Sequence, residues 1–366
     1  MRYLITGGGT SGHVNPAIAI AEALQVKDKN ASILFVGTEK KIEATLVPRA
    51  GFHIKFIDVI GLSRGKNFRA IKQNIVALQK YGKAKKQLRA IIRDFRPDVA
   101  IGTGGYVSAP VISEACKRGI KTVILEENAF AGITTKMLAK KVDRILLSLE
   151  LAKPLNVNPS KVRIVGNPAR PEFLTMTREQ SRKKLGLGLD DIVVLSCGGS
   201  LGATCINQAF CVMAKHAAAD DMMILYHSAS REYRQVMDNL GDILDNPKIR
   251  IFEYIYNMSE VMAAADLVIS RSGASTLTEI SALGRASILI PSPYVAENHQ
   301  YFNAKAFSDV GAAVLIEEKN LNGDELYNIV CDIVLNTSKR LKMEQSAKKL
   351  YNKDALDDIC AEILSL

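Results

Sequence analysis

The sequence predicts an α/β protein made of two Rossmann-like domains that face a cleft. Three observations support this fold class. First, short runs rich in Ile, Val and Leu recur along the 366 residues. Second, nearly all of these runs are followed by Gly or polar turns and then by a helical stretch. Third, a glycine-rich turn of similar construction opens each half of the chain. Because a single core stops growing near ~250 residues, we expect two domains with a ligand between them.

Eight apolar runs have the length and composition of buried parallel strands. The turns and helical stretches that separate these runs indicate parallel βαβ units. We expect strands at residues 2–5, 32–36, 98–101, 122–125, 192–196, 222–226, 266–270 and 287–290.

The two domains are predicted to join where Gly and Pro interrupt the pattern, at residues 165–168. The N-terminal domain is then 1–165 and the C-terminal domain 166–345. The last stretch, 346–366, has apolar residues at helical spacing and is predicted to be one amphipathic helix that completes the N-terminal domain. These apolar residues are Leu350, Leu356, Ile359 and Ile363.

Composition restricts where the protein works. No segment approaches the ~20 consecutive apolar residues that span a bilayer. Residues 1–5 form a strand pattern without the features of a secretory signal, so we expect the protein in the cytoplasm. The six cysteines include no Cys-x-x-Cys pair, which argues against a zinc site and a disulfide framework.

Positive charge is concentrated in one segment. The net charge of +10 suggests an anionic partner, and between residues 61 and 96 only Asp94 is acidic. Interleaved apolar residues predict a helix lying on an anionic membrane surface; a solvated basic face is the alternative, and RNA binding is disfavoured because no nucleic-acid motif accompanies the segment. The basic residues are Arg64, Lys66, Arg69, Lys72, Lys80, Lys83, Lys85, Lys86, Arg89, Arg93 and Arg96, and the apolar ones Phe68, Ile71, Ile75, Val76, Leu78 and Tyr81.

Three glycine-rich turns follow predicted strands. Residues 7–12 fit G-x-G-x-x-G and lead to Asn15 and Pro16, which are predicted to start a helix whose bare N–H groups attract phosphate. Residues 198–203 repeat the construction, and 102–106 form a third tight turn. Each alone is explained by turn geometry, but three in a basic protein favour phosphate-bearing ligands. A dinucleotide cofactor is disfavoured because the second strand lacks the expected terminal acid.

A fourth turn, residues 271–279, has two interpretations. Thr276 and Glu279 have the spacing of a capping box, which would make them purely structural. The functional interpretation uses the N–H groups of the turn for phosphate and the Glu279 carboxylate for the two hydroxyls of a ribose.

Eight sequence blocks in a fixed order carry a resemblance. They are GGGTSGHVNPAIAIAEAL, VGT with IEATLVPRAG, PDVAIGTGGYVSAP, EEN with AGITTKMLA, VGNPAR, GGSLGA, RSGASTLTEISALG and ENHQYFNA. The ordered set resembles the MurG family, peptidoglycan N-acetylglucosaminyltransferases that act on lipid-linked N-acetylmuramyl-pentapeptide. The resemblance implies the GT-B glycosyltransferase architecture, with UDP-GlcNAc mainly on the C-terminal domain and the acceptor mainly on the N-terminal one.

The resemblance also implies site residues. It places acceptor contacts at Gly104, Gly105 and Tyr106. Arg170 has the charge to neutralise diphosphate, and Gln300 the amide to bond sugar hydroxyls. The donor positions are Thr10, Ser11, Gly12, Asn128, Arg170, Ser200, Ile255, Ala274, Ser275, Thr276, Leu277, Thr278, Glu279 and Gln300.

This chain departs from the family pattern near two of these positions. Ser11 stands where the family usually has glycine. Leu125 and Glu127 replace the His and Gln that commonly flank the Glu-x-Asn motif, so a negative charge is added beside the predicted sugar contact of Asn128.

The implied reaction is a single displacement with inversion, from an α-linked UDP-sugar to the C4 hydroxyl of the muramyl acceptor. Among five histidines, His13 follows the first glycine turn at a helix start, where the helix dipole is expected to lower its pKa and keep it a neutral base. A structural hydrogen-bonding role is the alternative for His13. We expect no cofactor and no obligatory bound cation, because helix ends and Arg170 serve the leaving UDP.

The expected partners are UDP-GlcNAc, the lipid-linked muramyl-peptide acceptor and an anionic membrane surface, with no nucleic acid. Proteins of cell-wall synthesis or division are compatible partners. The protein is expected to be peripheral, on the cytoplasmic face of the cell membrane. Three alternatives stay open: a UDP-GlcNAc 2-epimerase, a glycolipid glycosyltransferase of the same architecture, and a non-catalytic UDP-sugar-binding scaffold.

Overall fold

The computed structural model describes residues 1–61, 68–199 and 202–366, with side chains for all of these except 68–79 and 81. The chain divides into two compact units. Unit 1 comprises Met1–Pro168 and Lys353–Leu366, and unit 2 comprises Ala169–Asn352. The assignment of the acceptor to one unit and the donor to the other stays a prediction.

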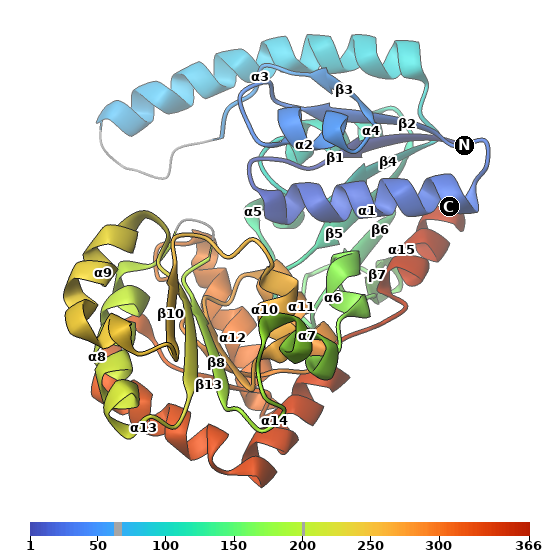
Figure 1. Ribbon diagram of the computed structural model, residues 1–366. Helices are drawn as coiled ribbons and strands as arrows, with labels where there is room; N and C mark the ends of the chain where they lie inside the picture. Colours follow the sequence, from blue (N-terminus) through green and yellow to red (C-terminus); the bar gives the residue numbers. More distant parts are fainter. Residues whose placement is uncertain (62–67, 200–201) are drawn as a thin grey trace. The chain divides into compact units, whose positions relative to one another are not determined.

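Unit 1 is built on a parallel sheet of seven strands in its described residues, in the order β3-β2-β1-β4-β5-β6-β7. Every crossover between neighbouring strands runs through helix or loop on a face of the sheet (Figure 1). The strands are β1 (Arg2–Thr6), β2 (Ser32–Gly37), β3 (His53–Phe56), β4 (Val99–Gly102), β5 (Lys121–Glu126), β6 (Arg144–Leu147) and β7 (Val162–Ile164).

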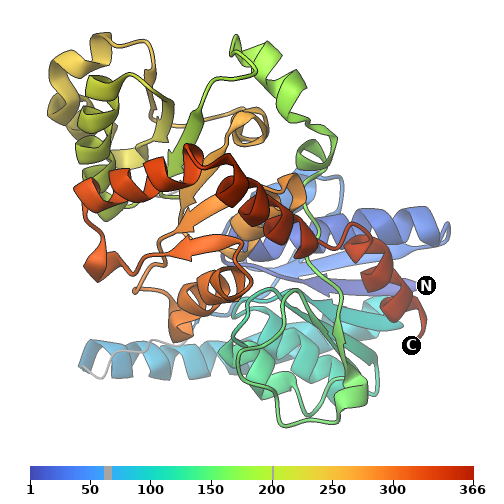
Figure 2. The ribbon, with the colours of Figure 1, turned by 90° about the horizontal axis from the view of Figure 1, so that it is seen from below.

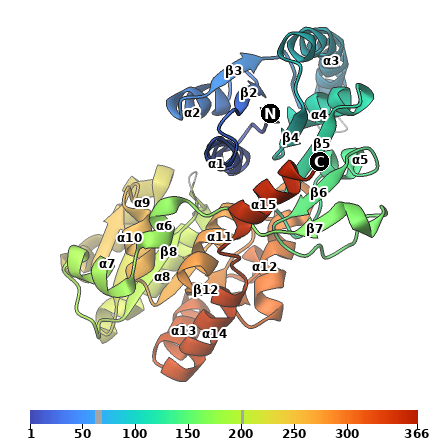
Figure 3. The same cartoon turned by 90° about the vertical axis from the view of Figure 1, so that its right-hand side faces the viewer.

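Helices cover both faces of this sheet. Successive side chains of a strand point to opposite faces, so each strand contributes to the packing on both sides. Tyr3 and Ile5 of β1 join one apolar cluster with α1 and α15, whereas Leu4 joins a second cluster with α3 and α4. Figure 3 shows α15 beside α1. The helices are α1 (Ser11–Lys27), α2 (Glu43–Arg49), α3 (Phe68–Phe95), α4 (Ser108–Lys117), α5 (Ile133–Leu138) and α15 (Ala355–Leu364), with a short 3-10 helix, η1 (Pro159–Lys161).

The long helix α3 has two different halves. Its C-terminal half buries Ala84, Leu88 and Ile92, spaced one turn apart, in the core of unit 1. Its N-terminal half extends beyond the other elements of unit 1 (Figures 1 and 2). No described helix is both long and apolar enough to cross a bilayer.

The C-terminal segment is not one helix. The prediction of a single helix over 346–366 is wrong, because α14 (Thr337–Lys349) ends before it and α15 begins only at Ala355. Leu356, Ile359 and Ile363 share one face of α15, but Leu350 lies six residues before Leu356, out of helical phase, and caps α14 instead. The break allows α14 to pack in unit 2 and α15 in unit 1.

Unit 2 repeats the architecture with six parallel strands in the order β10-β9-β8-β11-β12-β13. Numbered from its own first strand, its order is 3-2-1-4-5-6, which the first six strands of unit 1 share and which typifies nucleotide-binding doubly wound sheets. The strands are β8 (Val193–Cys197), β9 (Ile224–Ser228), β10 (Ile249–Phe252), β11 (Leu267–Ser270), β12 (Ala286–Leu289) and β13 (Ala313–Leu315).

Helices cover both faces of this second sheet (Figure 1). The core joins Val194, Leu267 and Ile288 of the central strands to Phe210 of α8 and Val330 of α13. The helices are α6 (Pro171–Thr175), α7 (Arg178–Leu185), α8 (Thr204–Asp220), α9 (Tyr233–Leu240), α10 (Met258–Ala264), α11 (Ala274–Leu283), α12 (His299–Asp309), α13 (Gly323–Val334) and α14, with the 3-10 helices η2 (Ser230–Glu232), η3 (Gly241–Asp245), η4 (Ala296–Asn298) and η5 (Glu318–Asn320).

Candidate functional site

Ligands of doubly wound sheets bind at the carboxyl ends of the strands, where the strand order reverses. The order reverses between β1 and β4 in unit 1, and between β8 and β11 in unit 2. The glycine turns identified in the sequence follow these four strands, at residues 7–12, 103–106, 198–203 and 271–273. Each unit therefore carries one candidate site at its own reversal point.

A pocket of about 540 Å³ occupies the reversal point of unit 2. It contains two predicted donor residues, Thr276 and Gln300, while Ser200 lies outside the described residues. The pocket is lined by Gly198, Gly199, Gly202, Ala203, Thr204, Cys205, Arg271, Gly273, Thr276, Ser292, Tyr294, Val295, Gln300 and Glu318.

Two helices begin at this pocket without a side-chain cap. The N-cap residues are Ala203 for α8 and Gly273 for α11, and neither supplies a capping oxygen. Uncapped N–H groups at a positive helix end attract phosphate. Glycine is required in the turn before α8, because a Cβ on Gly198 would lie 2.4 Å from the backbone nitrogen of Ala203.

The capping-box interpretation of Thr276 and Glu279 is wrong. Because Gly273 is the N-cap, Thr276 lies inside the first turn of α11, and the Glu279 carboxylate bonds Arg170 instead. The first residues of α11, 274–276, are half-buried and lie next to the pocket. Leu277 and Thr278 are buried, and the Leu277 N–H already donates to the Gly273 carbonyl at 3.0 Å.

Arg170 and Glu279, two predicted donor residues 109 positions apart, form an ion pair within unit 2. The guanidinium Nε and Nη2 both lie 2.9 Å from Glu279 Oε1, so Oε2 accepts none of the hydrogen bonds found among the described residues. Burial raises the pKa of Glu279, and the charge of Arg170 opposes that rise. The predicted contact between Glu279 and a ribose stays a prediction.

Arg170 is also held by two further groups. Its Nη1 lies 3.3 Å from Glu172 Oε1, and the guanidinium sits 4.6 Å from the centre of the Phe173 ring. The predicted role of Arg170 in neutralising diphosphate therefore requires it to share its charge with two carboxylates.

Gln300 is fixed within the pocket. Its Oε1 accepts the Ser292 backbone N–H at 2.8 Å, which leaves the amide NH₂ as the group for a sugar oxygen. Its own backbone carbonyl accepts the Ser272 hydroxyl at 2.7 Å.

Residues that sequence reasoning missed complete this pocket. Arg271 directly follows β11, donates to the Ile290 carbonyl at 3.0 Å and pairs with Glu318 at 2.6 Å. The only sequence signal for it was an arginine placed between a buried strand and a glycine. Tyr294 lies in the loop after β12 and Glu318 begins η5, and neither had a sequence signal.

Ile255 is buried, between the exposed Tyr254 and Tyr256. A hollow of about 590 Å³ adjoins it and is lined by both tyrosines together with Arg231 and Tyr233. This aromatic hollow also escaped prediction. The backbone of Ile255, rather than its side chain, is what a donor could contact.

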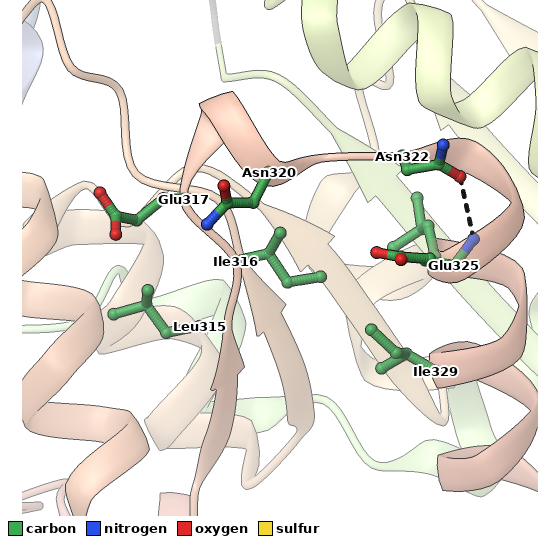
Figure 4. A pocket seen from close by; sticks show the side chains of 8 residues that line it. Leu315, Ile316, Glu317, Asn320, Asn322, Glu325 and Ile329 are labelled. Atoms are coloured by element: carbon green, nitrogen blue, oxygen red, sulfur yellow. Dashed lines mark hydrogen bonds between the residues drawn. The ribbon is translucent and has the colours of Figure 1, made fainter.

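A smaller hollow of about 200 Å³ lies between β13 and the start of α13 (Figure 4). Leu315, Ile316 and Ile329 form its apolar floor, and Asn322 caps α13 by accepting the Glu325 N–H at 3.1 Å. None of its residues is a predicted site residue or lies on a glycine turn, so we assign it no ligand.

In unit 1 the first glycine turn is already occupied by a protein carboxylate. Glu43, which is fully buried, accepts the Gly9 N–H at 3.0 Å and both the N–H and the hydroxyl of Thr38, at 3.1 and 2.6 Å. The expectation that this turn offers bare N–H groups to phosphate is therefore wrong for Gly9. An anion there would face a buried carboxylate.

The predicted acceptor residues lie directly against this turn. Gly104 and Gly105 have φ of +118° and +81°, and a Cβ on Gly105 would lie 2.2 Å from the Gly8 carbonyl oxygen, so only glycine fits. The Tyr106 hydroxyl lies 3.3 Å from the Thr38 hydroxyl, and its ring packs beside Gly9. The structure brings these three residues together with the start of α1.

Helix α1 begins earlier than predicted. The expected start at Asn15 and Pro16 is wrong, because Thr10 is the N-cap, Ser11 is the first helical residue and Pro16 lies inside the helix. The Val14 N–H bonds the Thr10 carbonyl at 3.3 Å, which starts the helix one turn sooner. Thr10 and Ser11 are exposed and Gly12 is half-buried.

His13 lies in the first turn of α1 and faces a buried carboxylate. Its Nδ1 is 3.4 Å from Glu127 Oε1. Burial alone would lower the pKa of His13, but Glu127 and, more weakly, Glu126 more than offset burial and raise it above its ordinary value. The expectation of a lowered pKa was therefore wrong, because the helix position was visible in the sequence and the carboxylate 114 residues away was not.

Asn128 belongs to a loop organised by Glu126. Its backbone N–H and its side-chain amide both donate to Glu126 Oε1 at 3.1 Å, and Glu126 Oε2 accepts the Gly132 N–H and the Thr135 hydroxyl. Four hydrogen bonds thus make Glu126 the anchor of the loop after β5.

Family models match both halves of the chain. The glycosyltransferase family 28 N-terminal domain matches residues 3–147, and the family 28 C-terminal domain matches 193–359.

Similar proteins agree with this match. A protein from Acetivibrio thermocellus, named UDP-N-acetylglucosamine–N-acetylmuramyl-(pentapeptide) pyrophosphoryl-undecaprenol N-acetylglucosamine transferase, is 42% identical over 360 residues, covering 98% of this chain and 96% of its own. The solved structure of Acinetobacter baumannii MurG matches with a TM-score of 0.81 and 25% identity over 100% and 99% of the two chains.

A structure described as a putative UDP-N-acetylglucosamine 2-epimerase from Listeria monocytogenes matches with a TM-score of 0.70 and covers 100% and 96% of the two chains, but at 13% identity it shows only a shared fold. Matches to both domain models and full-length identity above 40% place the sequence more narrowly: the chain belongs to glycosyltransferase family 28, within its MurG branch.

Proposed function

We propose that this protein transfers N-acetylglucosamine from UDP-GlcNAc, with inversion, to the muramyl C4 hydroxyl of undecaprenyl-pyrophosphoryl-N-acetylmuramyl-pentapeptide in peptidoglycan synthesis. The observation that carries the proposal is full-length identity of 42% to a transferase of that name. The 2-epimerase alternative has only the shared fold in its favour, and fold alone does not fix chemistry.

The donor is proposed to bind unit 2. The pocket between the turns after β8 and β11 has two uncapped helix starts for the diphosphate, and Glu279, about one turn beyond Thr276 on α11, is the proposed ribose contact. Positive helix ends stabilise the charge that develops on the leaving UDP.

The acceptor is proposed to bind unit 1, at Gly104, Gly105 and Tyr106. In the transfer, the acceptor oxygen forms a bond to the anomeric carbon as the bond from that carbon to the UDP oxygen breaks. The hydroxyl proton passes to His13, and the electron pair of the broken bond leaves with UDP.

A coupled assay for UDP release tests the proposed function. Release of UDP should require the lipid-linked acceptor. UDP-GlcNAc turnover without acceptor, yielding an isomeric UDP-sugar, would favour an epimerase, and tight UDP-GlcNAc binding without turnover would favour a scaffold.

Replacement of Glu279 by alanine should weaken UDP binding by about 1–3 kcal/mol, roughly 5- to 150-fold, because a charge-assisted hydrogen bond to ribose is lost. Isothermal titration calorimetry with UDP measures this loss of affinity. Glu172→Ala is the matched control, since it removes the exposed carboxylate from the same arginine. Unchanged UDP affinity in Glu279→Ala, or tight NADH binding by the native protein, would contradict the nucleotide assignment.

We further propose a peripheral location on the cytoplasmic face of the cell membrane, with α3 contributing to the contact. Among its described cations, Lys80 and Lys83 pair with Asp58, Arg89 with Glu114 and Arg93 with Asp94. Lys85 and Lys86 form no ion pair with any described residue, so they are the cations most available to lipid phosphate. Arg64 and Lys66 lie outside the described residues.

Binding to anionic vesicles should decline as salt rises, and Lys85→Glu with Lys86→Glu should weaken it further, because each surface cation contributes about 1 kcal/mol. Sedimentation with phosphatidylglycerol vesicles measures this. Lys183→Glu with Lys215→Glu, the same charge change at exposed positions of unit 2, should have a smaller effect. Equal binding to neutral and anionic vesicles at every salt concentration would refute the electrostatic contact.

A further inference from the structure

The carboxylate of Glu127 lies in an unusual place for a structural acid. The residue directly follows β5, and only 3% of its side chain is exposed. A buried carboxylate is costly unless hydrogen bonds or a cation compensate it. Within the described part of the chain, the hydrogen-bonding group found within reach is the imidazole of His13, with Nδ1 3.4 Å from Oε1.

The neighbouring acid, at the end of β5, shows what a structural carboxylate looks like. Glu126 is equally buried, but its two oxygens accept four hydrogen bonds from Asn128, Gly132 and Thr135. The two oxygens of Glu126 are therefore occupied by hydrogen bonds that hold the loop after β5. Within the described part of the chain, the hydrogen-bond partner found for Glu127 is the ring of His13.

The turn after β4 contacts both the backbone and the ring of His13. The Thr103 hydroxyl donates to the His13 backbone carbonyl at 2.6 Å, and the ring lies so close to Gly104 that a Cβ there would be 2.5 Å from Nδ1. Because Nδ1 faces the carboxylate, the proton of the neutral ring belongs on Nδ1 and the free lone pair on Nε2. The side chain of His13 keeps 28% of its surface exposed, so a substrate hydroxyl has access to it.

We propose that Glu127 is a positioning residue for His13: it accepts the Nδ1–H, presents Nε2 to the acceptor hydroxyl, and stabilises the imidazolium that forms when that hydroxyl loses its proton. The inference rests on the proposed function and on His13 as the base. The proton moves from the acceptor hydroxyl to Nε2, the Nδ1–H stays in place, and Glu127 stays ionised. In other carboxylate–histidine pairs the acid likewise fixes the tautomer of the histidine without taking the proton.

This arrangement has a measurable pH signature. Among the described residues, the charged groups that act on the ring are Glu126, the last residue of β5, and Glu127, which follows it, while the turn after β4 presents the uncharged Thr103 and Gly104. Removing the Glu127 charge should lower the pKa of His13, because one of the two carboxylates that raise it is lost. A base acts only when unprotonated, so the acidic limb of the kcat profile should move to lower pH in Glu127→Gln.

The variant Glu127→Gln keeps the size of the side chain and an acceptor oxygen. We expect kcat to fall on the order of tenfold, with the KM for UDP-GlcNAc unchanged and the acidic limb shifted downward. Glu127→Asp restores the charge and should recover the position of the limb. In a His13→Ala background, Glu127→Gln should cause no further loss, because Glu127 acts through the histidine.

An unmoved acidic limb with kcat within threefold of native, or an equal loss in the His13→Ala background, would overturn the proposal. A second readout does not depend on activity. Imidazole C–H resonances, assigned with His13→Ala, should show a lower His13 pKa in Glu127→Gln than in the native protein, and an unchanged pKa would overturn the pairing. If the native protein lacks acceptor-dependent UDP release, the proposed function fails, while this titration still tests the pair.

Discussion

Replacement of His13 by alanine should lower kcat by about 10²–10⁴-fold while leaving most of the affinity for UDP-GlcNAc, because general-base catalysis contributes on that scale. The structure gives the residue a ring packed against Gly104, a side chain that is 28% exposed and a carboxylate partner. The acidic limb of the pH profile should disappear with it. Steady-state kinetics with lipid-linked acceptor across a pH series measures both effects.

His53→Ala is the matched control. This histidine lies in β3, is exposed in the same unit and should leave kcat unchanged. Turnover of His13→Ala within about threefold of native would exclude the base assignment. A large loss of UDP-GlcNAc affinity with normal saturated turnover would instead make His13 a binding residue.

Replacement of Asp266 by alanine should destabilise unit 2 by about 3–5 kcal/mol, because it leaves a buried guanidinium without its counter-charge. Asp266 Oδ2 accepts from Arg182 at 2.7 Å and from the Val193 N–H at 2.9 Å, and Arg340 lies 3.2 Å from Oδ1. Only 2% of the Arg182 side chain is exposed. Hydrogen exchange of β8 and β11, compared with the strands of unit 1, localises the loss.

Asp309→Ala provides the contrast. It removes one partner of the Lys305–Asp309 pair, whose side chains are 50% and 58% exposed, and should cost no more than about 1 kcal/mol. If Asp266→Ala changed exchange no more than Asp309→Ala, the buried network would not be what holds α7 and α14 to the starts of β8 and β11.

The central strands could be predicted from the sequence, and the outer ones could not. All eight predicted strands are present within two residues of their expected bounds, because a central parallel strand is apolar on both faces. The missed β3, β7, β10 and β13 are edge strands with one open side and mixed composition. β6 is internal, but its apolar run, Ile145–Leu147, is too short to stand out.

The glycine turns located both reversal points, since φ > 0 and close backbone approaches leave few alternatives to glycine. Which side chain faces each turn could not be predicted from the neighbouring sequence. Glu43 bonds Gly9 from 34 residues away and Glu127 reaches His13 from 114. For this reason the phosphate expectation at Gly9 and the direction of the His13 pKa were both wrong.

The donor pocket likewise contains residues that could be predicted from the sequence and residues that could not. Thr276 and Gln300 could be carried over from the family motif, whereas Arg271, Tyr294 and Glu318 come from the ends of different elements and meet only in the folded unit. The Arg170–Glu279 pair joins two residues that the motif gave separate roles.

The most direct test of the account is the structure of the product. The protein should be incubated with UDP-GlcNAc carrying a ¹³C label at the anomeric carbon and with undecaprenyl-pyrophosphoryl-N-acetylmuramyl-pentapeptide, and the lipid fraction examined by NMR. We expect one labelled N-acetylglucosamine per acceptor, in β configuration, on the muramyl C4 oxygen. Label that stays on the nucleotide, or that reaches the acceptor in α configuration or on another hydroxyl, would contradict it.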